Sequence, residues 1–328
     1  MKLPLLIASL SLLLVVLFVL SLLVGPAALG MTDLLALFSD DQADVARLIM
    51  QEVRLPRTLL ALTIGMSLGV SGAALQGLLR NPLAEPGVMG ISGASALGAV
   101  VALYFGLSAV FALALPLMAI AGAALAVLAL QLLSARSTSL VVVLAGVAIA
   151  SLTGALISLA LNFSSNPFAA MEIIFWMLGS VTDRSMDHVW LALPMMALGW
   201  GVLLLTGARL DVLSLGEDTA TSLGVNLAQT RLLVIAGCAL CVGPATAVSG
   251  VIGFVGLVVP HLLRPLVGHQ PARLLPVSLL AGGVLLLVAD ILVRLAATGQ
   301  EMKLGVVTAL VGAPFFLMLV VRARRLGL

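Results

Sequence analysis

Two short serine motifs are the first candidates for chemistry in this chain. Residues 90–93 read Gly-Ile-Ser-Gly, the pattern of intramembrane serine proteases, and residues 65–69 read Gly-Met-Ser-Leu-Gly. A serine nucleophile needs a base within hydrogen-bond reach. None of the three histidines is placed in the middle of a long apolar run: His188, His261 and His269. We therefore interpret Ser92 as a small residue at a helix contact, where serine and glycine let backbones approach closely.

The motifs of metal and nucleotide sites are absent from the sequence. No Gly-Lys dipeptide occurs, which excludes a phosphate-binding loop of the GxxxxGKS/T type. Cys238 and Cys241 form a CxxC pattern inside an apolar run, an environment that favours inert, buried thiols. The histidines lack metal-ligand spacing. We expect no catalytic residue, no metal and no cofactor in this chain, so any ATP and magnesium would be bound by a partner subunit.

Two arginines open one of the apolar runs. Arg54 and Arg57 enclose Leu55 and Pro56, and proline suits the first turn of a helix. Arginines three residues apart then lie on one helix face. They either anchor the helix at the membrane interface or form a cationic docking spot for an acidic partner outside.

An acid and a base lie four residues apart in another apolar run. Asp290 precedes Arg294, which is the better order for an ion pair within a helix and eases membrane insertion. An ion-coupled transporter would also use such a carboxylate. However, seven residues at about 1.5 Å each separate Asp290 from Ala297, which places the acid near the end of its span. A structural pair is preferred, and an outward-pointing Arg294 beside Arg54 and Arg57 stays open.

The stretch 211–225 is predicted to be an inner loop with a short helix. Glu217 and Asp218 favour a helix N-terminus, and Gly224 suits its C-terminal end. Leucine and alanine side chains would then be exposed on this loop. Such a helix either lies on the bilayer or contacts a soluble partner, which is the sharper interpretation. The turn at 80–87 has two prolines and a glycine, which predict a fixed backbone.

The composition excludes most classes of protein. Of the 328 residues, 62% are apolar and 9% are charged, whereas a soluble domain is about half apolar and about a quarter charged. A mean hydropathy of +1.26 is too high for a globular protein with a polar surface. The net charge of +2 is spread out, without the basic block that nucleic acid would need. We predict an integral membrane protein in which residues 1–328 form a single transmembrane domain.

Distances between charges predict about ten transmembrane helices in an all-α fold. A span needs about 20 apolar residues, and charge is costly at the bilayer centre. The 50 uncharged residues of 86–135 suffice for two helices with a turn near 106–108. Residues 232–263 predict a helix to about Val248, a glycine turn and a short returning helix. The other spans are predicted at 3–24, 58–79, 137–171 (ending at the breakers 162–167), 189–208, 274–295 and 304–321.

An even number of spans puts both termini on one side of the membrane. With cytoplasmic termini, ten Lys and Arg residues lie inside and six outside, which agrees with the positive-inside rule. The tail with Arg322, Arg324 and Arg325 contributes most to this bias. The first run of 22 residues exceeds the roughly 7–15 residues of a signal-peptide core, so a retained helix is predicted.

Several motifs together resemble the permease subunits of bacterial ABC importers for iron chelates, haem and vitamin B12. They occur from the second span to the end of the chain, and several in order are more specific than any one alone. The motifs are Arg-Leu-Pro-Arg at 54–57, Arg-Asn-Pro-Leu-Ala-Glu-Pro-Gly at 80–87 within 76–93, Leu-Ala-Gly-Val at 144–147, the loop 215–225, Ser-Gly-Val-Ile-Gly-Phe-Val-Gly at 249–256 with the following residues to 261, Ala-Asp at 289–290, and 305–314.

The resemblance implies a ten-helix permease of a type II ABC importer, with both termini in the cytoplasm. Such subunits pair as dimers, here a homodimer, with the substrate path along the dimer axis in the inner (cytoplasmic) membrane. Two cytoplasmic ATPase subunits drive the cycle, and a periplasmic binding protein delivers the substrate. Membrane lipid surrounds the dimer, and no nucleic acid is involved.

The resemblance also implies three groups of site residues. Docking of the binding protein would use Arg54, Arg57 and Arg294. The loop that couples to the ATPase would comprise Leu213, Ser214, Leu215, Gly216, Glu217, Asp218, Ala220, Thr221, Leu223 and Gly224. The cytoplasmic gate would comprise Asn81, Leu83, Thr138 and Ser139.

An iron chelate of the siderophore type is the predicted substrate, because it is the broadest class in the family; haem and vitamin B12 are alternatives. A large chelate needs a wide path of low-affinity walls, so this subunit needs no metal ligands of its own. Three other classes stay open: an ion-coupled secondary transporter that uses Asp290, an intramembrane serine protease that uses Ser92, and a purely structural membrane protein.

Overall fold

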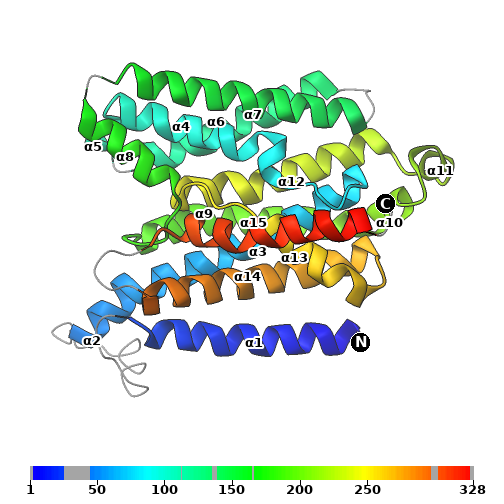
Figure 1. The fold of residues 1–328 in the computed structure, drawn as a ribbon, viewed down its shortest axis with the longest axis horizontal. Helices are drawn as coiled ribbons and strands as arrows, with labels where there is room; N and C mark the ends of the chain where they lie inside the picture. The colour runs from blue at the N-terminus through cyan, green and yellow to red at the C-terminus, as the bar shows by residue number, and fades with distance from the viewer. Residues whose placement is uncertain are drawn as a thin grey trace.

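The protein is a bundle of helices that lie side by side (Figure 1). The computed structural model describes residues 3–25, 45–111, 113–134, 139–164, 166–296 and 302–325, and these contain no β-strand. The first half comprises α1 (Leu3–Leu23), α2 (Val45–Leu48), η2 (Ile49–Arg54), α3 (Leu55–Leu79), η3 (Pro86–Met89), α4 (Ile91–Tyr104), α5 (Leu107–Val110), α6 (Ala114–Ser134) and α7 (Ser139–Asn162). The second half comprises α8 (Pro167–Met177), α9 (Met186–Leu205), α10 (Gly207–Leu213), α11 (Glu217–Ser222), α12 (Leu227–Ser249), α13 (Val255–Leu263), η4 (Arg264–Val267), α14 (Pro271–Ala296) and α15 (Leu304–Arg325).

The ten predicted spans correspond to helices of the structure. Seven helical stretches among the described residues are long and apolar enough to cross a membrane. They contain α1, α3, α6, α7, α9, α12 and α14, and the shorter apolar helices α4, α13 and α15 lie where the other three spans are predicted. The two helices predicted within residues 232–263 are confirmed. α12 ends at Ser249, and α13 starts at Val255 after a loop with glycines. The turn near 106–108 is also present, with Gly106 at φ +66°.

The structure corrects two of the predicted boundaries. The span within 137–171 ends at Asn162, at the predicted breakers, but the residues after the breakers form a separate helix, α8, which the sequence did not predict. The side chain of Asn166 accepts a hydrogen bond from the backbone N–H of Phe168, which caps the start of α8. The span predicted at 189–208 ends at Leu205 and is followed by the short helix α10, which the sequence did not predict.

Helix α3 lies in the interior of the bundle, and most of its residues are buried. It crosses α14 at a point where neither helix has a side chain. A Cβ atom added to Gly65 would overlap with the carbonyl oxygen of Gly282, and one added to Gly282 would overlap with the carbonyl oxygen of Gly65. Small residues let transmembrane backbones approach this closely, so that dispersion contacts replace the hydrophobic effect that lipid does not supply.

The two chain ends lie at the same end of the bundle (Figure 1). The start of α1 and the end of α15 point toward the end of the bundle that carries α10 and α11, whereas α2 and α5 lie at the opposite end. This arrangement agrees with an even number of crossings and with termini on the same side as the loop 211–225. We call the end with α10 and α11 the inner end and the end with α2 the outer end.

Candidate functional site

A buried charge cluster joins α3 to α14 at the outer end. Asp290 of α14 is fully buried and lies between Arg57 and Arg294. Its Oδ1 is 2.9 Å from Nε and 2.9 Å from a terminal nitrogen of Arg57, and its Oδ2 is 2.6 Å from a terminal nitrogen of Arg294. The predicted pair of Asp290 with Arg294 is thus confirmed. The second partner, Arg57, is 233 positions away in sequence.

The same cluster holds the C-terminal end of α1. The last carbonyl groups of a helix lack partners within the helix. Arg54 donates from Nη1 to the carbonyl oxygens of Leu22 and Leu23, both at 2.7 Å. Arg294 donates to the carbonyl oxygens of Ser21 at 2.7 Å and Val24 at 2.8 Å, and also to the Ser21 hydroxyl. Positive charge is favourable at a helix C-terminus, so these arginines fix α1 against the bundle.

The three arginines predicted to dock a binding protein are therefore brought together, but below the surface. The exposed fractions are 3% for Arg54, 8% for Arg57 and 9% for Arg294. Arg57 also lines an outer recess of about 230 Å³ together with Glu52, Val53 and residues 182–185. The sequence indicated a partner within the chain for Arg294, but none for Arg54 or Arg57. Their docking role stays a prediction, and the recess is the place where Arg57 meets solvent.

The predicted coupling loop forms two short helices at the inner end. α11 begins at Glu217, as the acidic pair predicts, and Gly224 after it has a φ of +85°. Glu217 pairs with Arg231 of α12 at 3.1 Å. Leu215 and Leu223 are 64% and 63% exposed, as expected for a contact loop, whereas the prediction of exposed alanine is wrong for Ala220, which is fully buried.

The remaining loop residues divide in the same way. Leu213 is buried beside the core, while Ser214, Asp218 and Thr221 are exposed. Asp211 accepts a hydrogen bond from the backbone N–H of Ala272 at 2.8 Å, which ties α10 to the start of α14. The loop is thus anchored to the bundle on one face and presents leucines on the other.

The predicted gate turn follows α3 directly. Arg80 has a φ of +48° at the C-terminal end of α3, and the side chain of Asn81 accepts a hydrogen bond from the backbone N–H of Leu83 at 2.9 Å. Asn81 and Leu83 are both exposed. Of the second predicted gate segment, Ser139 is the first residue of α7, and Thr138 lies outside the described residues.

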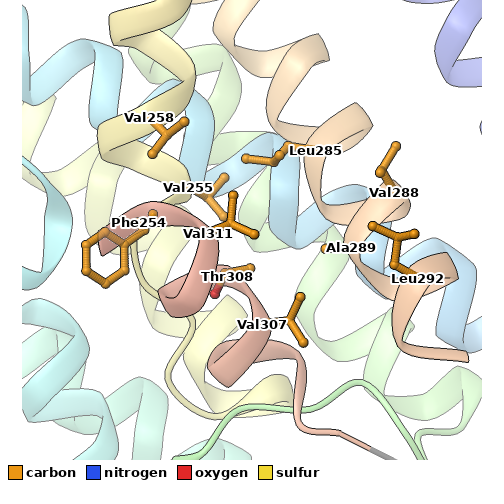
Figure 2. A pocket seen from close by; sticks show the side chains of 11 residues that line it. Phe254, Val255, Val258, Leu285, Val288, Ala289, Leu292, Val307, Thr308 and Val311 are labelled. Carbon is orange, nitrogen blue, oxygen red and sulfur yellow. The ribbon is translucent and has the colours of Figure 1, made fainter. Parts of the chain in front are cut away.

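One pocket of the bundle is lined almost entirely by apolar side chains. Figure 2 shows this pocket of about 150 Å³ between α13, α14 and α15, lined by aliphatic side chains such as Val255, Leu285 and Val311. No group of three or more His, Cys, Asp or Glu residues that could hold a metal ion occurs among the described residues. This pocket has no polar group suited to orient a polar substrate.

The cysteines and serines that were candidates for chemistry lie in environments that indicate a structural role. Cys238 and Cys241 are fully buried in α12. The Ser67 hydroxyl accepts a hydrogen bond from the Trp200 indole at 2.9 Å, and the described residues give Ser92 no hydrogen bond to a histidine. A nucleophile needs such a base. The serine motifs therefore function here as helix contacts.

Comparison with known proteins identifies relatives over almost the whole chain. The family model of the FecCD transport family matches residues 13–322. The vitamin B12 import system permease protein BtuC of Vibrio cholerae is 43% identical over 274 residues, which are 83% of this chain and 82% of that protein. The Fe(3+) dicitrate transport system permease protein FecD of Escherichia coli is 38% identical over 276 residues, which are 84% of this chain and 86% of that protein.

A solved structure has the same architecture. It shows an inward-facing conformation of an ABC transporter assigned to the metal-chelate type, and its chain is 36% identical to this one. The TM-score is 0.87, with 97% of this chain and 99% of that chain covered. The fold is thus shared with an ABC transporter of known structure.

We predict that Asp290 is essential for folding through its two arginines. Asp290→Ala would leave two buried guanidinium groups without their counter-charge, a change that costs about 3–5 kcal/mol. Thermal unfolding of the purified protein in detergent should show a large decrease in Tm. Asp187→Ala is the matched control, because Asp187 is exposed at the start of α9 and its loss should leave Tm nearly unchanged. Equal melting of the two variants would contradict the prediction.

Proposed function

Because this chain belongs to the FecCD transport family, we propose that it carries an iron chelate of the siderophore type through the inner membrane. The chain is a multi-pass permease of an ABC importer of this family. The observation that carries the substrate proposal is the likeness to a transporter assigned to the metal-chelate type, at a TM-score of 0.87. Vitamin B12 is the second candidate, favoured by the 43% identity to the Vibrio cholerae permease.

The absence of donor groups fits a substrate that brings its own metal ligands. The described residues contain no cluster of metal-binding side chains. A chelate is already coordinated, so the path has only to admit and release it. Walls of low affinity serve transport better than a tight site, since tight binding would slow release.

Three partners are proposed from the surfaces of the bundle. ATPase subunits would grip the inner loop at Leu215 and Leu223, because leucines this exposed on a polar loop need a covering surface. A second copy of the chain and lipid would cover the apolar faces of α7, α8 and α15, whose exposed side chains include Leu140, Leu144, Phe168, Phe175 and Leu317. A binding protein would dock at the outer end.

The geometry suggests how ATP would drive transport. Closure of the ATPase subunits would push on α10 and α11, which are tied to α12 by the pair of Glu217 with Arg231 and to α14 by Asp211. The push would shift packed helices rather than bend them, since packed interfaces change between discrete arrangements. The side-chain-free crossing of α3 and α14 allows such a shift without disturbing a side-chain interlock.

Transport assays in vesicles test the proposed function. The chain reconstituted alone should concentrate nothing, because its sequence has no phosphate-binding loop and the carboxylate of Asp290 is paired with two arginines. Together with its ATPase subunits, its binding protein and ATP, it should accumulate a ferric siderophore faster than cobalamin or haem. Faster uptake of cobalamin than of a ferric siderophore would contradict the proposed substrate and favour vitamin B12. Uphill uptake by the chain alone would refute the ABC importer mechanism and favour a secondary transporter.

We predict that the two exposed leucines of the inner loop hold the ATPase. Leu215→Glu together with Leu223→Glu should abolish co-purification with the ATPase subunits, because the carboxylates would be desolvated at the contact. Leu266→Glu is the matched control, since Leu266 is also an exposed leucine, in η4 and outside the loop. Quantified subunit ratios should be two permeases to two ATPases in the control. If the double variant still assembled with the ATPase subunits, the proposed contact through Leu215 and Leu223 would be wrong.

We predict that an acidic side chain of the binding protein enters the outer recess. Reversal of Arg57 would break its pair with Asp290, so the test changes the recess acids instead. Glu52→Gln and Asp183→Asn each remove an exposed negative charge from the recess. Each should tighten docking by about two- to threefold at low salt and less at high salt, measured as the Kd of the binding protein. Weaker docking would show that the partner presents positive charge there.

A further inference from the structure

Glu85 is an acidic residue whose side chain lies inside the bundle. It follows the gate turn, and it lines a small recess with Leu68, Ser92 and Gly253. Leu68 lies eleven residues before the end of α3, which corresponds to about 17 Å along the helix. The carboxylate therefore lies well inside the bundle and is partly buried. A charged group at such a depth is costly and needs a specific partner.

The partner of Glu85 is the start of α13. Glu85 and Phe254 line the same recess, and the backbone N–H of Phe254 is the hydrogen-bond partner of the carboxylate. Phe254 precedes the first residue of α13 and has a φ of +67°, an unusual conformation for a residue with a side chain. The N-terminal N–H groups of a helix lack partners within the helix, and the helix dipole favours negative charge there. Glu85 thus caps a helix that begins inside the membrane from a distant segment of the chain.

Helix α13 is bound on the side of α3 and borders a pocket on the other. Gln76 of α3 donates to the carbonyl oxygens of Gly256 at 3.3 Å and Leu257 at 3.5 Å, and accepts a hydrogen bond from Arg264 at 2.5 Å. A Cβ atom at Gly72 would overlap with the carbonyl oxygen of Gly256, so the backbones touch. On the opposite side lies the apolar pocket of about 150 Å³ (Figure 2), which opens to the surface beside the exposed side chains of Leu292 and Val311.

The gate turn also reaches the coupling loop at the inner end. A guanidinium nitrogen of Arg80 lies 3.9 Å from the place of a Cβ atom on Gly216, the residue before Glu217. Along the chain, only the turn 81–84 separates Arg80 from Glu85. A displacement of α11 would therefore meet the turn at Arg80, and the turn is joined to α13 through Glu85.

We propose that Glu85 is a positioning residue that makes the gate turn and α13 move as one unit when the coupling loop moves. This inference rests on the proposed transport function and on the predicted role of the turn at Asn81 and Leu83 as its cytoplasmic gate. Without the cap, α13 would stay against α3 through Gln76 while the turn moved separately. The ATP-dependent movement of the gate would then be lost, although the bundle could still fold.

Thiol labelling of the gate tests the inference. The reporter is Leu83→Cys in the full complex with its ATPase subunits in vesicles, since Cys238 and Cys241 are fully buried. The ratio of labelling rates with and without ATP and Mg²⁺ measures gate movement. Glu85→Ala should reduce this ratio about tenfold, as expected for the loss of a hydrogen bond to a charged group. Glu85→Gln keeps an acceptor of the same length and should retain most of the ratio.

Two further variants separate positioning from folding. Glu85→Asp keeps the charge but is one methylene too short to reach the Phe254 N–H, so it should behave like Glu85→Ala, and it decides the test if the alanine variant does not assemble. Asp187→Ala, an exposed acid at the outer end, should leave the ratio unchanged.

The outcomes distinguish the inference from the function beneath it. An unchanged ratio in Glu85→Ala or Glu85→Asp would overturn the role of Glu85 and leave the gate standing. A reporter that does not respond to ATP in the otherwise unchanged chain would overturn the gate, and the inference with it. A reduced ratio with normal Tm and assembly, rescued by Glu85→Gln, would support the inference.

Discussion

The constraint behind this structure is that a charge or an unpaired backbone group inside a bilayer must find its partner within the protein. Asp290 and its two arginines satisfy this constraint at the outer end, where the carboxylate lies within 3 Å of both guanidinium groups. Nη1 of Arg294 donates hydrogen bonds to two carbonyl oxygens at the C-terminal end of α1. One acid therefore sets the relative positions of α1, α3 and α14. Replacement of a buried pair by apolar side chains can be neutral in energy, so this cluster is best explained by the geometry that it specifies.

Direct contact between helix backbones is the second interaction that holds the bundle together. The crossing of α3 and α14 at Gly65 and Gly282 brings backbone against backbone. Such contacts are specific in distance but carry no interlocking side chains. The polar cluster fixes the outer ends of these helices, whereas the inner ends connect to the short helices α10 and α11. A bundle that is fixed at one end and driven at the other suits a subunit that receives its energy from outside.

The sequence predicts the spans well because the cost of buried charge leaves long uncharged runs between charged residues. It predicts contacts within one helix, such as Asp290 with Arg294, because helical spacing alone brings them together. It did not predict Arg57 as a partner of Asp290, since the order of neighbouring spans is needed for that. It also wrongly predicted that Ala220 is exposed. Which face of a short loop helix is buried depends on the segments that pack beneath it, and these cannot be identified from the sequence. The separate helix α8 was missed because its 11 residues are too few for a span.

Interrupted helices explain where this chain has its polar interior contacts. α12 and α13 are separated by a loop inside the bundle, and a break of this kind exposes backbone groups that lipid cannot satisfy. The donors and acceptors for the break come from Glu85 and Gln76, which belong to one other segment, α3 and its following turn. A continuous helix would need neither residue. Glu85 and Gln76 are therefore polar because the helix next to them is discontinuous. A helix that starts within the membrane also has an end that a neighbouring turn can displace.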